Sequence, residues 1–224
     1  MTHFALLADP VMRIEVQWPS GRYSLPQSKD GCPTSDWLSG WRYQDNEDDN
    51  NANSYDPSNV NNYLRIDTGR NLKTYYCTKT FSSDNGFTWP KGNYCIARYG
   101  GSCPSDFSSG SIHWDDEDDN NKNGLQKPIP DGDYGRNTRI QYCCRSDGSA
   151  NSEIMLPPTN DFILYRYNGV CQRVKCMDTR QLKIHFDDED SKNANSCSGA
   201  HPDNSVCSRN HDIYMCHYNT KNKC

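Results

Sequence analysis

The stretch Asp115–Gly124, DDEDDNNKNG, carries five consecutive carboxylates followed by two asparagines. A run of like charges repels itself, so the chain must either hold these side chains in place or leave them in a loose, solvated segment. Similar runs begin at Asp45 (DNEDDNNANS) and at Asp187 (DDEDSKNANS), and the steps between the three first Asp residues are 70 and 72 residues. Internal repetition at such a spacing predicts a fold built from three similar units.

Other landmarks keep the same period. WPSGRYSL at Trp18 matches WPKGNYCI at Trp89, and LPPTNDFIL at Leu156 matches both more weakly. Each acidic run follows a short strand-like stretch (WRYQ, SIHW or LKIHF) and precedes a stretch that ends in Cys (NLKTYYC, NTRIQYC or NHDIYMC). We therefore divide a single domain, residues 1–224, into three pseudo-repeats of about 70 residues at 18–88, 89–155 and 156–224.

The local pattern predicts an all-β fold. In the stretches before the acidic runs, neighbouring side chains are expected to point to opposite faces of a strand. One face would hold Arg42, Ile112 and Ile184, and the other Tyr43, His113 and His185. Gly, Pro, Asn and Asp interrupt the chain too often for a long amphipathic helix. Three units without cores of their own would pack around a pseudo-threefold axis, as in a β-trefoil or a β-prism, although about 70 residues per unit is long for a trefoil.

The composition indicates a disulfide-stapled extracellular domain. Only 33% of the residues are hydrophobic, and the mean hydropathy is −1.00, yet the chain has 12 Cys and 14 Tyr. The Cys spacing does not fit a zinc site, so the Cys residues are expected to form disulfides that offset a thin apolar core. The predicted localisation is therefore secreted.

The repeats suggest one equivalent disulfide per unit. We place Cys176 at the position of Cys32 and Cys103, but leave Cys171 open as the alternative. The expected bonds are Cys32–Cys77, Cys103–Cys143, and Cys216 with either Cys171 or Cys176, together with Cys95–Cys144; the remaining Cys residues would staple the third unit.

Charge argues against a nucleic-acid partner, and hydropathy argues against a membrane-spanning segment. The net charge is −5 and no basic face is visible, so we expect no nucleic-acid partner. No apolar run approaches the length of a membrane span.

The sequence resembles the C-terminal domain of apextrin, ApeC. The resemblance covers Trp18 to Tyr218, and the segments that carry it are WDDEDDNNKN, NTRIQYCCRSDG and FDDED in this order. It implies an extracellular protein of a marine invertebrate, active in innate immunity, that binds bacterial cell-wall glycan, peptidoglycan above all. A structural or adhesion protein of an extracellular surface is the alternative.

The acidic runs allow three interpretations. Asp and Asn side chains could satisfy the backbone of a tight turn, they could bind Ca²⁺ through hard oxygen ligands, or they could contact a saccharide. The EF-hand pattern is absent, because Asn50, Asn120 and Lys192 stand where that loop needs Gly. The candidate calcium ligands are Asp45, Glu47, Asp48, Asp115, Glu117, Asp118, Asp187, Glu189 and Asp190.

Trp residues beside the runs suggest a saccharide site. Trp41 lies near Asp45 and Trp114 precedes Asp115, so that a ring and a carboxylate could hold one sugar; Asp187 is the third candidate. The competing interpretation is that the Trp rings form the core. We expect no enzyme, because a catalytic pair such as Asp115 and Glu117 is needed once, whereas the run occurs three times.

Overall fold

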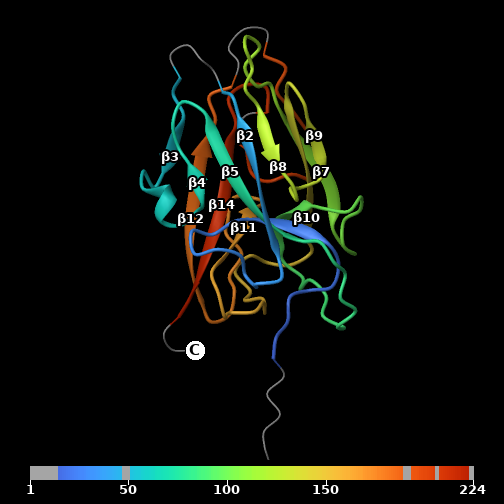
Figure 1. Cartoon of the computed structure of the whole chain (residues 1–224). Coiled ribbons are helices and arrows are strands. Elements are labelled where there is room, and N and C mark those ends of the chain that lie inside the picture. The colour runs from blue at the N-terminus through green and yellow to red at the C-terminus, as the bar shows by residue number, and fades with distance from the viewer. Residues whose placement is uncertain (1–14, 47–50, 189–192, 205–206, 222–224) are drawn as a thin grey trace, which may run out of the picture.

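Short antiparallel strands dominate the part of the chain that the computed structural model describes, residues 15–46, 51–188, 193–204 and 207–221 (Figure 1). The only helical element described there is a 3₁₀ turn, η1 (Val60–Asn62). The all-β prediction is confirmed. The strands are β1 (Tyr23–Pro26), β2 (Leu38–Gln44), β3 (Ser54–Asp56), β4 (Ile66–Asp67), β5 (Leu72–Lys79), β6 (Asn93–Arg98), β7 (Ser108–Trp114), β8 (Gly124–Gln126), β9 (Gly132–Tyr134), β10 (Thr138–Ser146), β11 (Phe162–Arg166), β12 (Met177–His185), β13 (Ser196–Gly199) and β14 (Asp212–Thr220).

All described strands join one curled antiparallel sheet. Three long strands each lie between two partners: β5 between β1 and β2, β10 between β6 and β7, and β14 between β11 and β12. The first strands of these groups also pair with one another, β1 with β6 and β6 with β11. Finally, the short strands after the acidic runs cross to another group: β3 pairs with β12, β8 with β2 and β13 with β7.

The predicted alternation is confirmed in β2, β7 and β12. Arg42, Ile112 and Ile184 point inward and are 1%, 0% and 2% exposed. Tyr43, His113 and His185 on the other face are only half-buried. Since successive side chains of a strand point to opposite faces, the inward set fixes the register of each strand against the interior.

Two clusters of buried side chains form the interior. One draws Leu72, Ile112 and Ile184 from all three thirds of the chain. The other is rich in aromatic rings, with Trp18, Trp37, Trp89, Tyr94 and Phe162 among its members. Within it, the ring centroids of Trp18 and Trp37 lie 5.1 Å apart. Large aromatic side chains thus supply much of the buried apolar surface of this polar chain.

Disulfides close the loops around these cores. The bonds with described partners are Cys32–Cys77, Cys95–Cys144, Cys103–Cys143, Cys171–Cys216 and Cys197–Cys207. Cys171, not Cys176, therefore takes the position of Cys32 and Cys103, and our placement of Cys176 there was wrong. Cys176 is bonded elsewhere. Its spacing from the acidic run misled the alignment, because β12 has nine residues where β2 and β7 have seven, and Phe186 adds one more before Asp187.

None of the described elements is a helix long and apolar enough to cross a bilayer.

Candidate functional site

The acidic runs begin where β2, β7 and β12 end. The segment between β7 and β8 forms a green loop at the top of Figure 1. Although charged, the first residues of the three runs are buried: Asp45 is 0% exposed, and Asp115 and Asp187 are each 6% exposed. Buried carboxylates need partners, and the structure supplies them from neighbouring runs.

Hydrogen bonds between the runs close a ring. The backbone N–H of the first Asp donates to the last Asn side chain of another run: Asp45 to Asn123 (2.7 Å), Asp115 to Asn195 (2.6 Å) and Asp187 to Asn53 (2.8 Å). The same Asp carboxylates accept a backbone N–H in return: Asp45 from Lys122 (2.6 Å), Asp115 from Ala194 (2.7 Å) and Asp187 from Ala52 (2.5 Å). Each run is therefore bonded to the two others. We call this arrangement the acidic ring.

The second oxygen of each first carboxylate is also occupied. The donors are the side-chain amides of three Asn residues that precede β5, β10 and β14: Asn71 on Asp45, Asn137 on Asp115 and Asn210 on Asp187. Protein N–H groups thus take two of the about four acceptor positions of each carboxylate, one at each oxygen. This geometry favours the interpretation of the runs as structural turns.

The calcium ligands proposed from the sequence do not converge among the described residues. A carboxylate oxygen of Glu117 accepts the backbone N–H of Asp119 at 2.8 Å, and Asp118 forms a surface ion pair with Arg136 at 2.6 Å. In the described ranges, the one group of three side chains with ligand atoms close enough for a metal contains no carboxylate. Glu47, Asp48, Glu189 and Asp190 lie outside the described residues, and calcium binding stays a prediction.

The second residues of the runs are buried more deeply. Asn46, Asp116 and Asp188 are all 0% exposed. Asp116 pairs with Arg42 of β2 at 3.2 Å and also accepts from the Thr138 hydroxyl at 2.5 Å. Burial raises the pKa of the Asp116 carboxyl to about 6, although the Thr138 bond and Arg42 oppose the shift.

Asp188 has no described cation beside it. It accepts from the Asn195 amide at 2.7 Å and from the His211 backbone N–H at 3.1 Å. Burial raises its pKa well above the ordinary range, and the neighbouring charge of Asp116 adds to the shift. These groups support the ring from inside, where no ligand can reach them.

Trp114 is not available to a saccharide. It is 1% exposed, and its ring packs on Phe186 and His211. The expectation that Trp114 stacks on a sugar is corrected, because a side chain that is almost fully buried cannot contact a ligand. Trp41 is only half-buried, but Gln126 accepts its N–H at 2.8 Å and the Lys73 ammonium lies 4.1 Å from its ring centroid.

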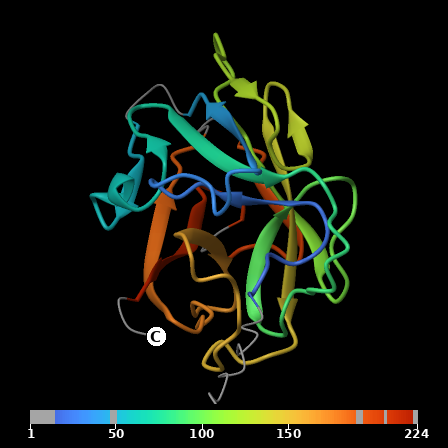
Figure 2. The same cartoon turned by 60° about the horizontal axis from the view of Figure 1, so that its bottom comes forward.

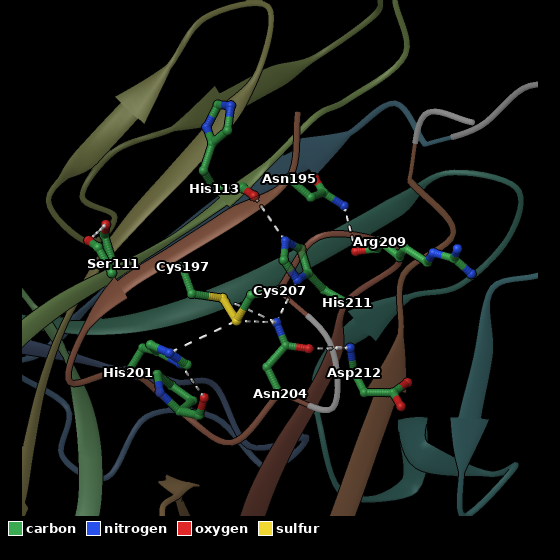
Figure 3. Close-up of a disulfide and its surroundings, with 12 residues drawn as sticks. Ser111, His113, Asn195, Cys197, His201, Asn204, Cys207, Arg209, His211 and Asp212 are labelled. Atoms are coloured by element: carbon green, nitrogen blue, oxygen red, sulfur yellow. Dashed lines mark hydrogen bonds between the residues drawn. A yellow bond between two sulfur atoms is a disulfide. The ribbon is translucent and has the colours of Figure 1, made fainter. Parts of the chain in front are cut away.

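The Cys197–Cys207 disulfide lies beside a group of His residues (Figure 3). His201 Nε2 is 4.0 Å from Cys207 Sγ, and the Asn204 amide contacts His211 Nδ1 at 2.5 Å. Cys197, His201 and Cys207 have the spacing of a metal triad, but both sulfurs are bonded to each other and cannot serve as thiolate ligands.

Two polar grooves lie at the other end of the strands. The first has a volume of about 520 Å³ and is bounded by Ser20–Arg22, Phe87–Trp89, and the loop from Tyr99 to Asp106 that precedes β7. Seven residues of β7 separate this loop from the acidic ring, a distance of about 20 Å. The segments before β1 and β6 lie in the lower half of Figure 1 and come forward in Figure 2.

The second groove has a volume of about 400 Å³ and lies between the loop Asp30–Ser35 and the segment Thr159–Asp161. Sequence reasoning proposed no residue of either groove as a ligand contact. The available signal was the pair of repeated motifs that bound them, GCPTSDW and SCPSDF on one side and the WPSGR and PPTND turns on the other.

Comparison with known proteins gives the family. The model of the C-terminal domain of apextrin, ApeC, matches residues 18–218. No curated protein and no solved structure matches the chain significantly. Since the match covers almost the whole chain, from the aromatic core at Trp18 to the last strand, the chain belongs to the ApeC family.

Proposed function

We propose that the chain is a secreted pattern-recognition protein that binds bacterial cell-wall glycan, peptidoglycan above all, in the manner of a lectin. Membership of the ApeC family carries this proposal. The disulfides support the extracellular location, since such bonds persist in oxidising compartments. The grooves support binding, because each offers hydroxyl groups on a disulfide-braced loop.

We also propose that the body of the protein is a three-repeat, pseudo-threefold arrangement. The closed hydrogen-bond ring of the acidic runs supports it, because the same two bonds occur at three places. The pairing of β3, β8 and β13 supports it too, because each pairs with the preceding group in one cyclic order.

The proposed protein is a binder and not an enzyme. The strongest candidate for a catalytic pair, Asp115 and Glu117, is buried: the Asp115 carboxylate is part of the ring, and the Glu117 carboxylate accepts the backbone N–H of Asp119 in its own run. Such groups lack the open face that an acid and a nucleophile need around a glycosidic bond.

Cosedimentation with insoluble peptidoglycan tests the proposal. We expect the protein in the pellet, and soluble muropeptides should release it. Absence from the pellet, together with no binding of soluble glycans, would favour the structural or adhesion protein. Clearing of the suspension would show hydrolysis and contradict a binding role alone.

A further inference from the structure

We propose that the first groove is the saccharide site and that it selects sugars carrying a carboxylate, which Arg22 binds. The proposal rests on the proposed function and names where and how the glycan is held. It further implies one such site per chain, in spite of the three repeats.

The walls of the groove are fixed before any ligand arrives. The Lys79 ammonium, buried at 3% exposure, donates to the carbonyls of Gly21 (2.9 Å) and Phe81 (3.0 Å) and to the Ser83 hydroxyl (3.2 Å). It thus joins the turn before β1 to the loop after β5. A groove held in this way loses little conformational entropy on binding.

The opposite wall is fixed by a carboxylate. Asp131 accepts the backbone N–H groups of Gly100 (3.0 Å) and Gly101 (2.7 Å) and pairs with Arg98 at 3.0 Å. Both glycines have positive φ, near +90°, which side chains rarely adopt. The Cys103–Cys143 disulfide then ties the following loop to β10.

Arg22 is the cation of the groove. Its side chain is exposed and lies against Gly100, whose carbonyl accepts one guanidinium N–H at 3.1 Å. A guanidinium has five N–H donors in a planar fork that matches a carboxylate, so this bond orients the group and leaves donors for a ligand. The resulting charge-assisted hydrogen bonds are the strong ones that a carboxylate ligand can form in this groove, whose other charged lining residue is the exposed Asp106 at the end of the Cys-Pro loop.

The remaining lining suits a sugar ring. Phe87 and Tyr99 are half-buried, so each keeps part of its ring in reach, and Trp89 forms a buried base held in the aromatic core. Ser102 and Ser105 are exposed hydroxyls in the same lining. Ring faces combined with a few polar groups are typical of small-molecule sites.

The two corresponding places in the chain differ in charge and shape. Asp161 stands at the position of Arg22 in the second groove, where it pairs with His217 at 3.2 Å, and Asp30 faces the same space. A carboxylate ligand would meet like charges there. At the third place Asn93 takes the position, and the buried Gln172 accepts its backbone N–H at 2.8 Å and fills the space beside Gly92.

Titration calorimetry with three probes tests the inference. The probes are a disaccharide of N-acetylglucosamine and N-acetylmuramic acid, the uncharged dimer of N-acetylglucosamine, and an oligogalacturonate. We expect wild-type protein to bind a carboxylate-bearing probe at one site per chain, and Arg22→Ala to weaken it about tenfold or more. The muramic probe carries its lactyl carboxylate free, as cell-wall glycan does once its stem peptides are removed, so the muramic and uronic probes distinguish a cell-wall source of the carboxylate from a plant or algal one.

A steric pair of variants separates the two grooves. Ser105→Trp fills the first groove and should abolish binding, whereas Ser35→Trp, in the Cys-Pro loop of the second groove, should bind as wild type. Thermal unfolding of each variant verifies that the fold is intact.

Four results would overturn the inference: unchanged binding by either Arg22→Ala or Ser105→Trp, loss of binding in Ser35→Trp alone, equal affinity for the uncharged dimer, or no binding of any carboxylate-bearing probe. In the first two cases, wild-type cosedimentation with peptidoglycan would leave the proposed function standing at another site. Conversely, the protein could fail to cosediment with peptidoglycan and still bind the uronic probe in a way that depends on Arg22. The groove inference would then stand and the proposed function would fall.

Discussion

Replacing Arg42 by Met should destabilise the protein in a strongly pH-dependent way. Arg42 is 1% exposed and donates to Asp116 (3.2 Å) and to the Thr138 hydroxyl (2.9 Å). Met keeps much of the apolar stem of Arg but removes the charge and the N–H donors to Asp116 and Thr138. The variant therefore leaves Asp116 buried without its cation.

The magnitude follows from the pKa of Asp116. Burial raises this pKa from 3.8 to about 6 even with Arg42 present. Because the folded value exceeds the unfolded one, the contribution of Asp116 to stability is greatest below about pH 4 and is lost as the pH rises toward 6. A shift of this size lowers the free energy of unfolding by roughly 3 kcal/mol between low and neutral pH.

Without Arg42 the pKa of Asp116 should rise further. The free energy of unfolding should therefore keep falling at pH values above 6. We expect Arg42→Met to lower the free energy of unfolding by about 3–5 kcal/mol at pH 7.5, the usual result of removing one partner of a buried pair. At pH 5 the carboxyl of the folded variant is neutral, and the loss should fall to about 2 kcal/mol or less.

Urea unfolding at the two pH values, with the disulfides intact, measures both quantities. Arg136→Met is the matched control, since the Arg136–Asp118 pair of the same acidic run is more than half exposed on both sides. Its removal should cost about 1 kcal/mol or less at either pH. Equal destabilisation by Arg42→Met at pH 5 and pH 7.5 would refute the reasoning, because the effect would then be one of packing.

Three further predictions concern the acidic ring. Asn123→Ala removes the acceptor of the Asp45 N–H and a donor to Asp116, and should lower the free energy of unfolding by about 2–4 kcal/mol in urea; a change below the measurement error would contradict the ring as a source of stability. Asp188→Asn, which copies Asn46 of the first run, removes a carboxyl of raised pKa and should raise the melting temperature at pH 7.5 but not at pH 4; the opposite order would contradict the sign. Millimolar calcium should leave the melting temperature unchanged, because N–H donors already occupy the first carboxylates; a rise of several degrees would restore the calcium interpretation.

The strands and the half-buried faces could be predicted from the sequence because they depend on local periodicity. The inward positions of Arg42, Ile112 and Ile184 follow from alternation alone. Three intra-unit disulfides were also predictable, since a repeated spacing implies a repeated bond. The third needed a choice between Cys171 and Cys176 that spacing did not settle.

The acidic ring was not predictable in the same way. Its bonds join residues far apart in the sequence, such as Asp45 and Asn123, and no local pattern tells which run a side chain will meet. The saccharide interpretation of Trp114 failed for a related reason, whereas the competing interpretation of this ring as core is confirmed. Its neighbour Asp115 is charged, which suggested a surface, whereas partners from another run allow both residues to be buried.

The contrast between the two ends of the strands bears on where function lies. At the acidic end, equivalent residues make equivalent bonds three times. Such repetition suits a structural role in the proposed three-repeat body. At the groove end the same position holds Arg22, Asn93 or Asp161, and each choice gives a different surface: a groove with a guanidinium, a filled space or an acidic groove. Recognition of an asymmetric ligand needs an asymmetric set of contacts. The residues that differ between repeats, rather than the acidic residues that recur, are therefore the ones whose replacement should change binding without unfolding the protein.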